Sequence, residues 1–523
     1  MKEINFFSCL YKYSGLILLF IMFSIAFFSF NEYGVSWDEQ QQRNIGYKSY
    51  DYVFNDDESL LEWYDRDYGV AFELPLVIIE KTLSSHNYFY DLTDSKTIYL
   101  MRHIVNHIFF LIGGFFLFLL IDFLYKNKLL AIVGFLLLIL HPRLYSHSFF
   151  NTKDIPFLSM FIISIYYTVK AFDKKTIFNF IKLGFCIGVL INLRIMGVMI
   201  LPCVIFALVI DSIISDKKIF HAKLIFILVL TSSLSLYITW PYLWIDPFNN
   251  FVLAFENMSR FRWETNSVLV NGELIKATEL SWWYIPTWFS ITTPIIYLLL
   301  GLFASLLVLY KFIKNPLISF SNSIRRHNLI FLVYFIAPVF IVVVLHSVLY
   351  DGWRQLYFIY PSFVLLIIYG LSFLAKNYNK VFNFTLLLLM ISLISSTNFM
   401  VKNYPLQHVY FNNFFSFTAP EYMRENYELD YWGVSYRKSF EYILKNDTSS
   451  LININVANPA GKKNLNILSS ADINRINLVS FNEASYFITN YRWHPEEYDD
   501  LNEYKFHSFK VGNNTVSQIF KLK

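Results

Sequence analysis

Residues 15–39 read GLILLFIMFSIAFFSFNEYGVSWDE and contain the two features that decide the fold of this chain. The first part, 15–30, is apolar and close to the length that an α-helix needs to cross a bilayer. Two adjacent carboxylates, Asp38 and Glu39, follow shortly after its end. Two interpretations of this pair are open. It is either an acidic turn that caps the next helix, or a pair of charges that serves a site at the membrane surface.

The composition extends this apolar pattern to the whole chain. Of its 523 residues, 55% are hydrophobic and 16% are charged, whereas a soluble protein has about 25% charged residues. No small-residue cleavage site follows the first apolar run, so we expect a retained helix and not a signal peptide. The net charge of +4 is uninformative by itself. We expect a lipid bilayer, and no nucleic acid, as the partner of such a surface.

Apolar runs recur along the chain and predict an α-helical polytopic membrane protein with about eleven transmembrane helices. The predicted spans are 13–30, 101–122, 129–141, 155–171, 178–193, 197–213, 221–240, 286–310, 328–347, 357–375 and 381–398.

Basic residues predict the orientation of these spans, because every second connection is short and basic. Examples are Lys126 with Lys128, Lys174 with Lys175, Lys217 with Lys218, and Lys376 with Lys380. The positive-inside rule places these connections and the N-terminus in the cytoplasm. The alternate connections then face outward across what we expect to be a bacterial inner membrane. The first of them, 31–97, is acidic, with fourteen acidic and five basic residues.

The tail of the chain has a different character, with shorter apolar runs and more Asn, Asp, Glu and Tyr. We expect a transmembrane domain over 1–398, which includes the large outer loop 31–97, and a small α/β domain over 399–523 outside the cytoplasm. In the tail, SFEYILKN (439–446) predicts a helix, LININVAN (451–458) and ASYFITNYR (484–492) predict strands, and SFKVGNNTVSQIFKL (508–522) predicts a hairpin that turns at Gly512, Asn513 and Asn514.

Charged and polar residues near the membrane gather on the predicted outer side. The stretches that contain them are SWDEQ (36–40), HPRLYSHSFFNTKDIPF (141–157), NLRIMG (192–197), WPYLWIDPF (240–248) and HSVLYDGWRQLYF (346–358). Such groups are costly in a membrane and mark functional sites or paired structural ones. Either group transfer involving a lipid carrier or transport accounts for them. The long outer loops and the outer tail favour an active site at the interface over a midplane transport pathway.

Several of these stretches resemble one family of membrane enzymes. The acidic pair after the first helix resembles the first-loop motif of the GT-C superfamily of membrane glycosyltransferases. The closer likeness is to the branch of protein O-mannosyltransferases and lipid A aminoarabinose transferases. NTKDIPF (151–157) is similar to an element of bacterial members. YDGWRQLYFIYP (350–361), YPLQHVYFNNF (404–414) and ELDYWGVSYRKS (428–439) are similar to late elements of related bacterial proteins. The likeness covers most of 15–440.

The resemblance implies a GT-C fold, a polyprenyl-phosphate sugar donor, an outward-facing active site and inversion at the anomeric carbon. A first-loop carboxylate would be the base, so Asp38 is the candidate, with Glu39 either positioning the acceptor or taking that role. Cations would hold the phosphate of the leaving lipid, and the cations available on the outer side are Arg143, Lys153, Arg194 and Arg354. Asp154 would orient a donor group or Lys153.

Other interpretations of these residues stay open. Lys153 and Asp154 also fit a helix start, Arg354 and Asp351 fit an interfacial ion pair as well as a binding site, and Arg194 fits a side chain that reaches toward the headgroups. Glu73 is a candidate for the acceptor side.

We expect no cofactor. A divalent metal has no ligand set to support it, because neither His103 with His107 nor Asp65 with Asp67 offers a third ligand. The acceptor is a glycan, a lipid or a protein. The alternative function is a multi-pass transporter or lipid flippase that uses the same outer-face charges.

Overall fold

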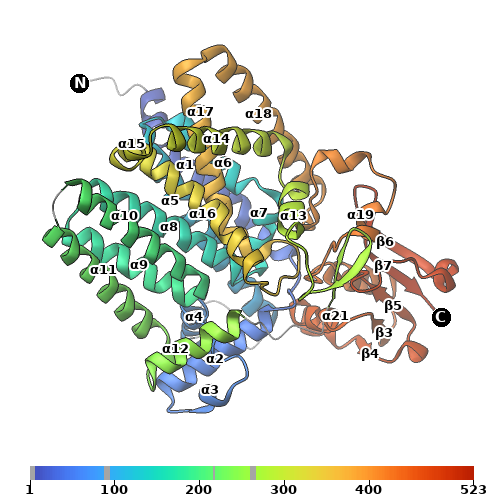
Figure 1. Ribbon diagram of the computed structural model, residues 1–523. Helices are drawn as coiled ribbons and strands as arrows, with labels where there is room; N and C mark the ends of the chain where they lie inside the picture. Colours follow the sequence, from blue (N-terminus) through green and yellow to red (C-terminus); the bar gives the residue numbers. More distant parts are fainter. Residues whose placement is uncertain (1–5, 87–94, 216–217, 260–266) are drawn as a thin grey trace.

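The computed structural model describes residues 6–86, 95–215, 218–259 and 267–523. Within these ranges, nine helices are long and apolar enough to cross a membrane. They are built on α1 (Phe6–Ser29), α5 (Ser95–Tyr125), α8 (Asp154–Asp173), α10 (Ile200–Ser215), α11 (Lys218–Thr239), α14 (Ile295–Lys314), α16 (Ser323–Val344), α17 (Tyr360–Asn377) and α18 (Asn379–Lys402). The chain is therefore a mainly helical, multi-pass membrane protein (Figure 1).

The prediction of about eleven spans is not confirmed, although each predicted segment is mostly helical in the structure. The predicted span 286–310 is divided at Thr293 and Pro294 between α13 (Tyr284–Thr292) and α14. The predicted span 129–141 is α6 (Lys128–Ile139), which bends by 63° into α7 (Pro142–Phe150). The bend follows from the sequence, because Pro142 lacks an N–H and the His141 side chain accepts from the Leu144 N–H to start a new helix. The predicted span 178–193 is α9 (Ile177–Leu193), which has 17 residues and is shorter than each of the nine helices long enough to cross a membrane.

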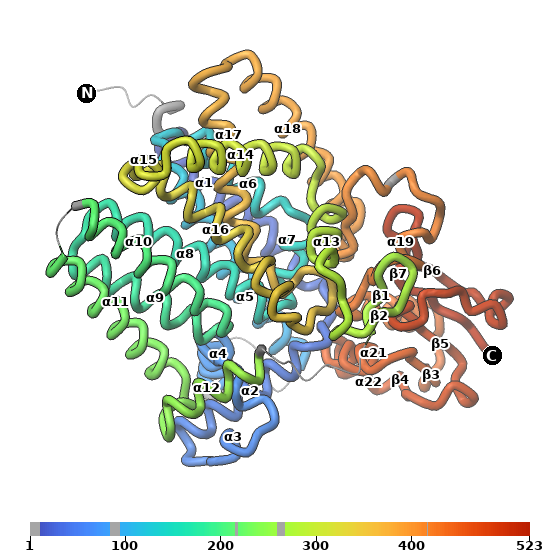
Figure 2. The backbone as a smooth tube through the Cα atoms, viewed as in Figure 1, coloured from blue at the N-terminus to red at the C-terminus, as the bar shows by residue number. Residues whose placement is uncertain are grey.

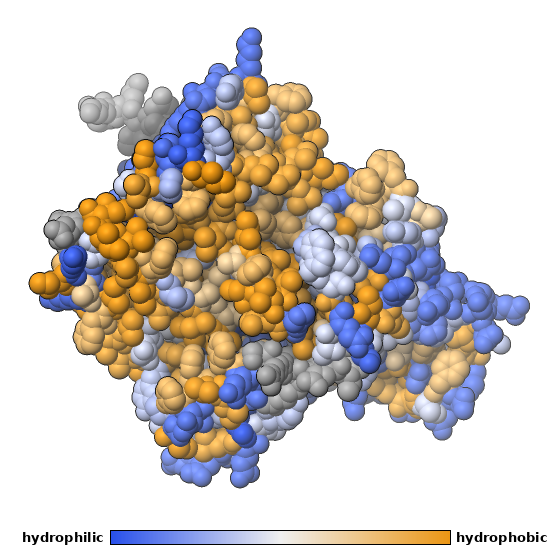
Figure 3. All heavy atoms as spheres, viewed as in Figure 1, coloured by the Kyte–Doolittle hydropathy of each residue, from blue (hydrophilic) through white to orange (hydrophobic). Residues whose placement is uncertain are grey.

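Two spans form the centre of the bundle. In the most apolar stretch of each helix, 83% of the residues are buried for α8 and 89% for the span that ends in α17. The same share is 28% for α10, α11, α14 and α18. The outer helices instead expose large apolar side chains such as Phe226 and Phe384. Figure 3 shows this apolar surface in orange over the helical part of the protein. An exposed apolar surface of this kind fits a position in the bilayer, where lipid surrounds these side chains in place of neighbouring protein.

Short elements cover one end of the bundle, which we call the covered end. They come from the first loop, as α2 (Glu39–Phe54), α3 (Ser59–Glu62) and α4 (Glu73–His86), and from α12 (Pro247–Ser259), α13 (Tyr284–Thr292) and the hairpin of β1 (Ser267–Val270) with β2 (Glu273–Lys276). The C-terminal region lies at the same end (Figure 2).

The C-terminal region contains a five-stranded sheet with strand order β4-β3-β5-β7-β6. The strands are β3 (Ile452–Val456), β4 (Ile476–Leu478), β5 (Tyr486–Thr489), β6 (Lys505–Val511) and β7 (Asn514–Lys521). β3 is parallel to β4 and β5, whereas β7 is antiparallel to β5 and β6. The helix α20 (Tyr436–Asn446) packs its apolar face on this sheet. The structure therefore has the predicted helix, both predicted strands and the predicted hairpin, and adds β4.

The first-loop stretch 33–38 is held by the C-terminal region. The Trp37 N–H donates to the Trp432 carbonyl at 3.1 Å, and the Asn464 side chain bonds both the N–H and the carbonyl of Val35 at 3.1 and 3.0 Å. Gly34 has no room for a side chain, because a Cβ there would overlap the Val434 carbonyl oxygen. These contacts fix the backbone immediately before Asp38.

Candidate active site

Asp38 lies at the start of α2, but its side chain makes no helix-capping hydrogen bond. Its carboxylate instead lies 3.4 Å from Nη2 of Arg354 and is 34% exposed, whereas the Arg354 side chain is 2% exposed. The capping interpretation of the acidic pair therefore does not describe the Asp38 side chain. Asp38 presents a partly accessible carboxylate next to a buried cation.

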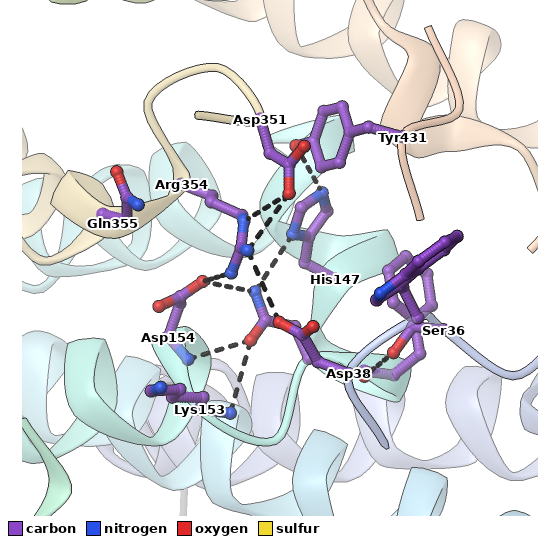
Figure 4. A network of polar contacts seen from close by, with 12 residues as sticks. Ser36, Asp38, His147, Lys153, Asp154, Asp351, Arg354, Gln355 and Tyr431 are labelled. Atoms are coloured by element: carbon purple, nitrogen blue, oxygen red, sulfur yellow. Dashed lines mark hydrogen bonds and ion pairs between the residues drawn. The ribbon is translucent and has the colours of Figure 1, made fainter. Parts of the chain in front are cut away.

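Arg354 contacts three carboxylates that come from distant parts of the chain (Figure 4). Besides Asp38, its Nη1 lies 3.2 Å from Asp154 and its Nε donates to Asp351 at 3.1 Å. The guanidinium also stacks over the rings of Trp432 and Tyr350, at 4.5 and 4.8 Å from the ring centroids. A guanidinium held on all sides in this way is pre-organised, so it loses little conformational entropy when it binds an anion.

Asp154 lies in the first turn of α8 between two arginines. Its Oδ1 lies 2.6 Å from Nη2 of Arg194, and its Oδ2 lies 3.2 Å from Nη1 of Arg354. Asn151 donates to the same carboxylate at 2.9 Å and accepts the Asp154 backbone N–H. A carboxylate at a helix N-terminus is also favoured by the helix dipole. Asp154 thus orients both arginines toward one point.

Lys153 also belongs to this cluster. Its Nζ lies 3.4 Å from the centroid of the Tyr68 ring, which comes from the first loop. Burial and the neighbouring Arg194 lower the pKa of Lys153 to about 7, against the opposing effect of Asp38 and Asp154. The charge of this ammonium group is therefore sensitive to its surroundings near neutral pH.

Glu39 points away from its neighbour Asp38 and is fully engaged in the interior. One carboxylate oxygen lies 2.9 Å from Nε2 of His103, and the other accepts the Ser36 N–H at 2.6 Å. The carboxylate is 1% exposed. In this arrangement Glu39 supports the turn that presents Asp38.

Two further candidates lie outside the cluster around Arg354. Glu73 is buried and pairs with Arg102, which also lies 2.8 Å from Glu80, and burial raises the pKa of Glu73. Arg143 is buried as well, with its Nε donating to the Tyr410 carbonyl at 2.8 Å and its guanidinium stacked over Phe411. The structure thus brings together Asp38, Lys153, Asp154, Arg194, Asp351 and Arg354.

Three residues of the site have no assigned role in the sequence interpretation. Arg492 donates to Asp351 at 2.9 Å, and Lys463 donates to the Trp37 carbonyl at 2.6 Å. His147 lies 3.4 Å from the hydroxyl groups of both Tyr357 and Tyr431. The first two lie beyond residue 445, where no motif of the sequence resembles the GT-C family. His147 lies in the stretch 141–157, which the sequence interpretation places on the outer side. That predicted position is the feature by which the sequence could have identified His147.

The described residues contain no group of three or more His, Cys, Asp or Glu that is arranged to hold a metal ion. His103 contacts Glu39, whereas Nδ1 of His107 lies 2.7 Å from the Ser148 hydroxyl. Asp65 accepts a hydrogen bond from Gln41, and Asp67 accepts one from Asn257. Each pair considered from the sequence is thus used in separate contacts.

The charges of the cluster favour an anion. Lys153, Arg194, Arg354 and Arg492 face the carboxylates of Asp38, Asp154 and Asp351. Arginine forks bind phosphate through two parallel hydrogen bonds, and lysine binds it as a point charge. The arrangement can hold an anionic group beside a carboxylate that is accessible to a second molecule. These features describe a membrane protein with a cluster of cations and carboxylates at its covered end, which is a candidate anion site.

Part of the chain is similar to a known family. Residues 95–237 match the sequence model of a family described as dolichyl-phosphate-mannose-protein mannosyltransferase. This match confirms the resemblance to the GT-C membrane glycosyltransferases of the protein mannosyltransferase type. No curated protein sequence matches the chain. Among solved structures, the chain is similar to ArnT from Cupriavidus metallidurans bound to undecaprenyl phosphate, with 10% identity, a TM-score of 0.45 and coverage of 97% of this chain and 98% of that chain.

Proposed function

We propose that this protein is an inverting glycosyltransferase that moves a sugar from a polyprenyl phosphate to an acceptor outside the cytoplasm. The observation that carries the proposal is the partly exposed carboxylate of Asp38, 3.4 Å from the buried guanidinium of Arg354. The family that matches residues 95–237 is described by a polyprenyl-phosphate sugar donor, which supports this donor class for the present chain.

The acceptor would bind on the accessible side of Asp38. As the acceptor oxygen attacks the anomeric carbon, its proton passes to the Asp38 carboxylate, which acts as general base. The bond between the anomeric carbon and the phosphate oxygen breaks in the same displacement, and the electron pair leaves with the polyprenyl phosphate. Attack from the side opposite the leaving group inverts the configuration of the sugar.

The leaving phosphate requires cations, since its negative charge increases as the bond breaks. Arg354, Arg194 and Lys153 would supply them from the other side of Asp38. Asp154 would hold both guanidinium groups in place, as its contacts at 2.6 and 3.2 Å indicate. Groups fixed in advance stabilise developing charge without reorganisation at the moment of reaction.

The topology that this function needs agrees with the basic connections. We propose that the covered end faces the outside of a bacterial inner membrane, with the N-terminus in the cytoplasm. We also propose a division into a transmembrane domain, 1–398, and an extracytoplasmic domain, 399–523. The geometry of the cations does not determine the acceptor. Identification of the product shows whether the acceptor is a glycan, a lipid or a protein.

The test compares a deletion strain of the native host complemented with the wild-type protein or with Asp38→Asn. Mass spectrometry of the envelope glycans, lipids and proteins measures the attached sugars. We expect one sugar to disappear from one product class in the deletion strain and to return only with the wild-type protein. An unchanged set of products in the deletion strain would overturn the proposal and favour transport by the same charged residues.

A further inference from the structure

One loop of the C-terminal sheet enters the anion site. The loop follows β5 and contains Arg492, whose Nη2 donates to Oδ1 of Asp351 at 2.9 Å. Both side chains are only 5% exposed. Nη1 of the same guanidinium donates to the Tyr431 carbonyl. Arg492 therefore joins the sheet to the residues around Arg354 through two contacts that are shielded from water.

The backbone on both sides of this contact adopts conformations that non-glycine residues rarely take. Tyr491 and Trp493, which flank Arg492, have φ angles of 59° and 63°, and Asp351 has a φ of 58°. Left-handed conformations of such residues persist only where the surroundings enforce them, and they cluster at functional sites. Here Asn490 fixes the loop, since its side chain donates to the Asp430 carbonyl at 2.8 Å.

Asp351 is shared between two arginines. Its Oδ2 accepts from Nε of Arg354, and its Oδ1 accepts from Arg492. A carboxylate bound on one oxygen alone can rotate about its χ2 torsion, which is broad. With both oxygens bound, the plane of the Asp351 carboxylate is fixed. The position of the oxygen that accepts the hydrogen bond from Arg354 is therefore fixed as well.

Glu428 is the other carboxyl group near Arg492, and it does not compete for this role. Its two oxygens are buried, and no hydrogen bond to them occurs within the described part of the chain. Burial and the charge of Asp351 raise the pKa of Glu428, although Arg492 opposes the shift. The side-chain hydrogen bond of Arg492 goes to Asp351, which is therefore its carboxylate partner in the structure.

We propose that Arg492 is a positioning residue of the donor site. It fixes Asp351, and through Asp351 it holds the guanidinium of Arg354 in the orientation that binds the donor phosphate. The inference rests on the proposed function, because that function assigns the phosphate to Arg354. On this view the C-terminal sheet is a component of the active site, although no group of the sheet touches the reacting atoms.

The experiment measures binding and turnover with purified full-length protein in detergent. The probe for binding is undecaprenyl phosphate, titrated into the wild type, Arg492→Ala, Arg492→Lys, Asp351→Asn and the double variant Arg492→Ala/Asp351→Asn. The matched control is Arg475→Ala. Arg475 is in the same domain and donates to backbone carbonyls of residues 444, 447 and 449, away from the site. Thermal unfolding of every variant is recorded in parallel.

We expect Arg492→Ala to weaken binding of undecaprenyl phosphate about 10-fold or more, Arg492→Lys to recover part of the loss, and the double variant to bind no worse than Asp351→Asn alone. Such non-additivity shows that the two residues act through one contact. Wild-type affinity in Arg492→Ala, full additivity, or an equal loss in Arg475→Ala would overturn the positioning role. A wild-type protein that neither binds the probe nor transfers a sugar would instead overturn the proposed function itself.

Discussion

Asp38 and Glu39 are consecutive in the sequence, yet their carboxylates belong to separate sets of contacts. Asp38 lies 3.4 Å from Arg354 at a partly exposed position, and Glu39 lies 2.9 Å from His103 in the interior. Successive residues at the start of a helix point about 100° apart, since the helix has about 3.6 residues per turn. The adjacent carboxylates therefore have different surroundings, with that of Asp38 partly exposed beside Arg354 and that of Glu39 buried beside His103.

The first prediction follows from this division. Asp38→Asn should lower kcat by about 100-fold or more, because the general base is lost, and should leave the melting temperature nearly unchanged. Glu39→Gln should instead lower the free energy of unfolding by about 1–3 kcal/mol, because a buried partner of His103 and of the Ser36 N–H is weakened. Sugar transfer from a labelled donor and thermal unfolding measure the two effects. A variant pair with the reverse pattern would assign the base to Glu39.

The second prediction concerns pH and Lys153. Since the pKa of Lys153 is lowered to about 7, the group is mostly charged at pH 6 and mostly neutral at pH 8.5. Binding of a phosphodiester donor should therefore weaken by about 5- to 10-fold as the pH rises through this range, because one cation is lost. The donor KM is measured between these pH values for the wild type and for Lys153→Met.

The methionine variant supplies the control for this dependence. It should have a high KM at every pH, and the dependence near pH 7 should disappear. A dependence that persists unchanged in Lys153→Met would show that another group titrates.

The third prediction concerns the buried ion pairs that Arg102 makes with Glu73 and Glu80. Glu73→Ala leaves Arg102 buried with only Glu80 as a carboxylate partner. Removal of one member of a buried ion pair costs about 3–5 kcal/mol, so the variant should unfold at a clearly lower temperature. Thermal unfolding in detergent measures this loss. If Glu73→Ala keeps the wild-type melting temperature and instead raises the KM for the acceptor, Glu73 lines the acceptor side as the sequence interpretation expects.

The fourth prediction tests the close packing of the first loop on the C-terminal region. In Gly34→Ala the new methyl group overlaps a backbone oxygen of Val434, which a rotamer change cannot relieve. The variant should be destabilised by about 1–3 kcal/mol and should lose transfer activity, since the backbone before Asp38 shifts. The matched control is Gly512→Asn, where no atom lies within 4 Å of the place that a Cβ would occupy and asparagine tolerates the positive φ. Equal behaviour of both variants would contradict this account.

The helices and strands follow well from the sequence, because membrane helices and alternating strands have strong periodic signals. One exception is the span at 129–141, because α6 has only twelve residues and the chain bends by 63° where His141 and Pro142 start α7. The same proline is visible in the sequence, but its effect on the direction of the chain depends on the packing of α7 against α5 and α8.

The site follows less well. The basic connections predict an outer face, and the charged residues on that predicted face include the clustered residues Asp38, Lys153, Asp154, Arg194, Asp351 and Arg354. The contacts of Glu39, Glu73 and Arg143 depend on which neighbour each side chain reaches, and a single sequence does not carry that information. Arg492 was missed because it reaches the site only through the pairing of β5 in the sheet and the unusual backbone of the loop that follows.

The bend between α6 and α7 has a consequence for the surroundings of the chain that leads to Lys153 and Asp154. With twelve residues, α6 is about 18 Å long, whereas the hydrocarbon core of a bilayer is about 30 Å thick. Eight of the twelve residues of α6 are buried, so neighbouring helices of the protein, and not lipid, surround most of this short helix. All nine residues of α7 are buried as well, and α7 leads the chain directly to Lys153 and Asp154. The backbone that carries these two residues is therefore enclosed by protein up to the start of α8.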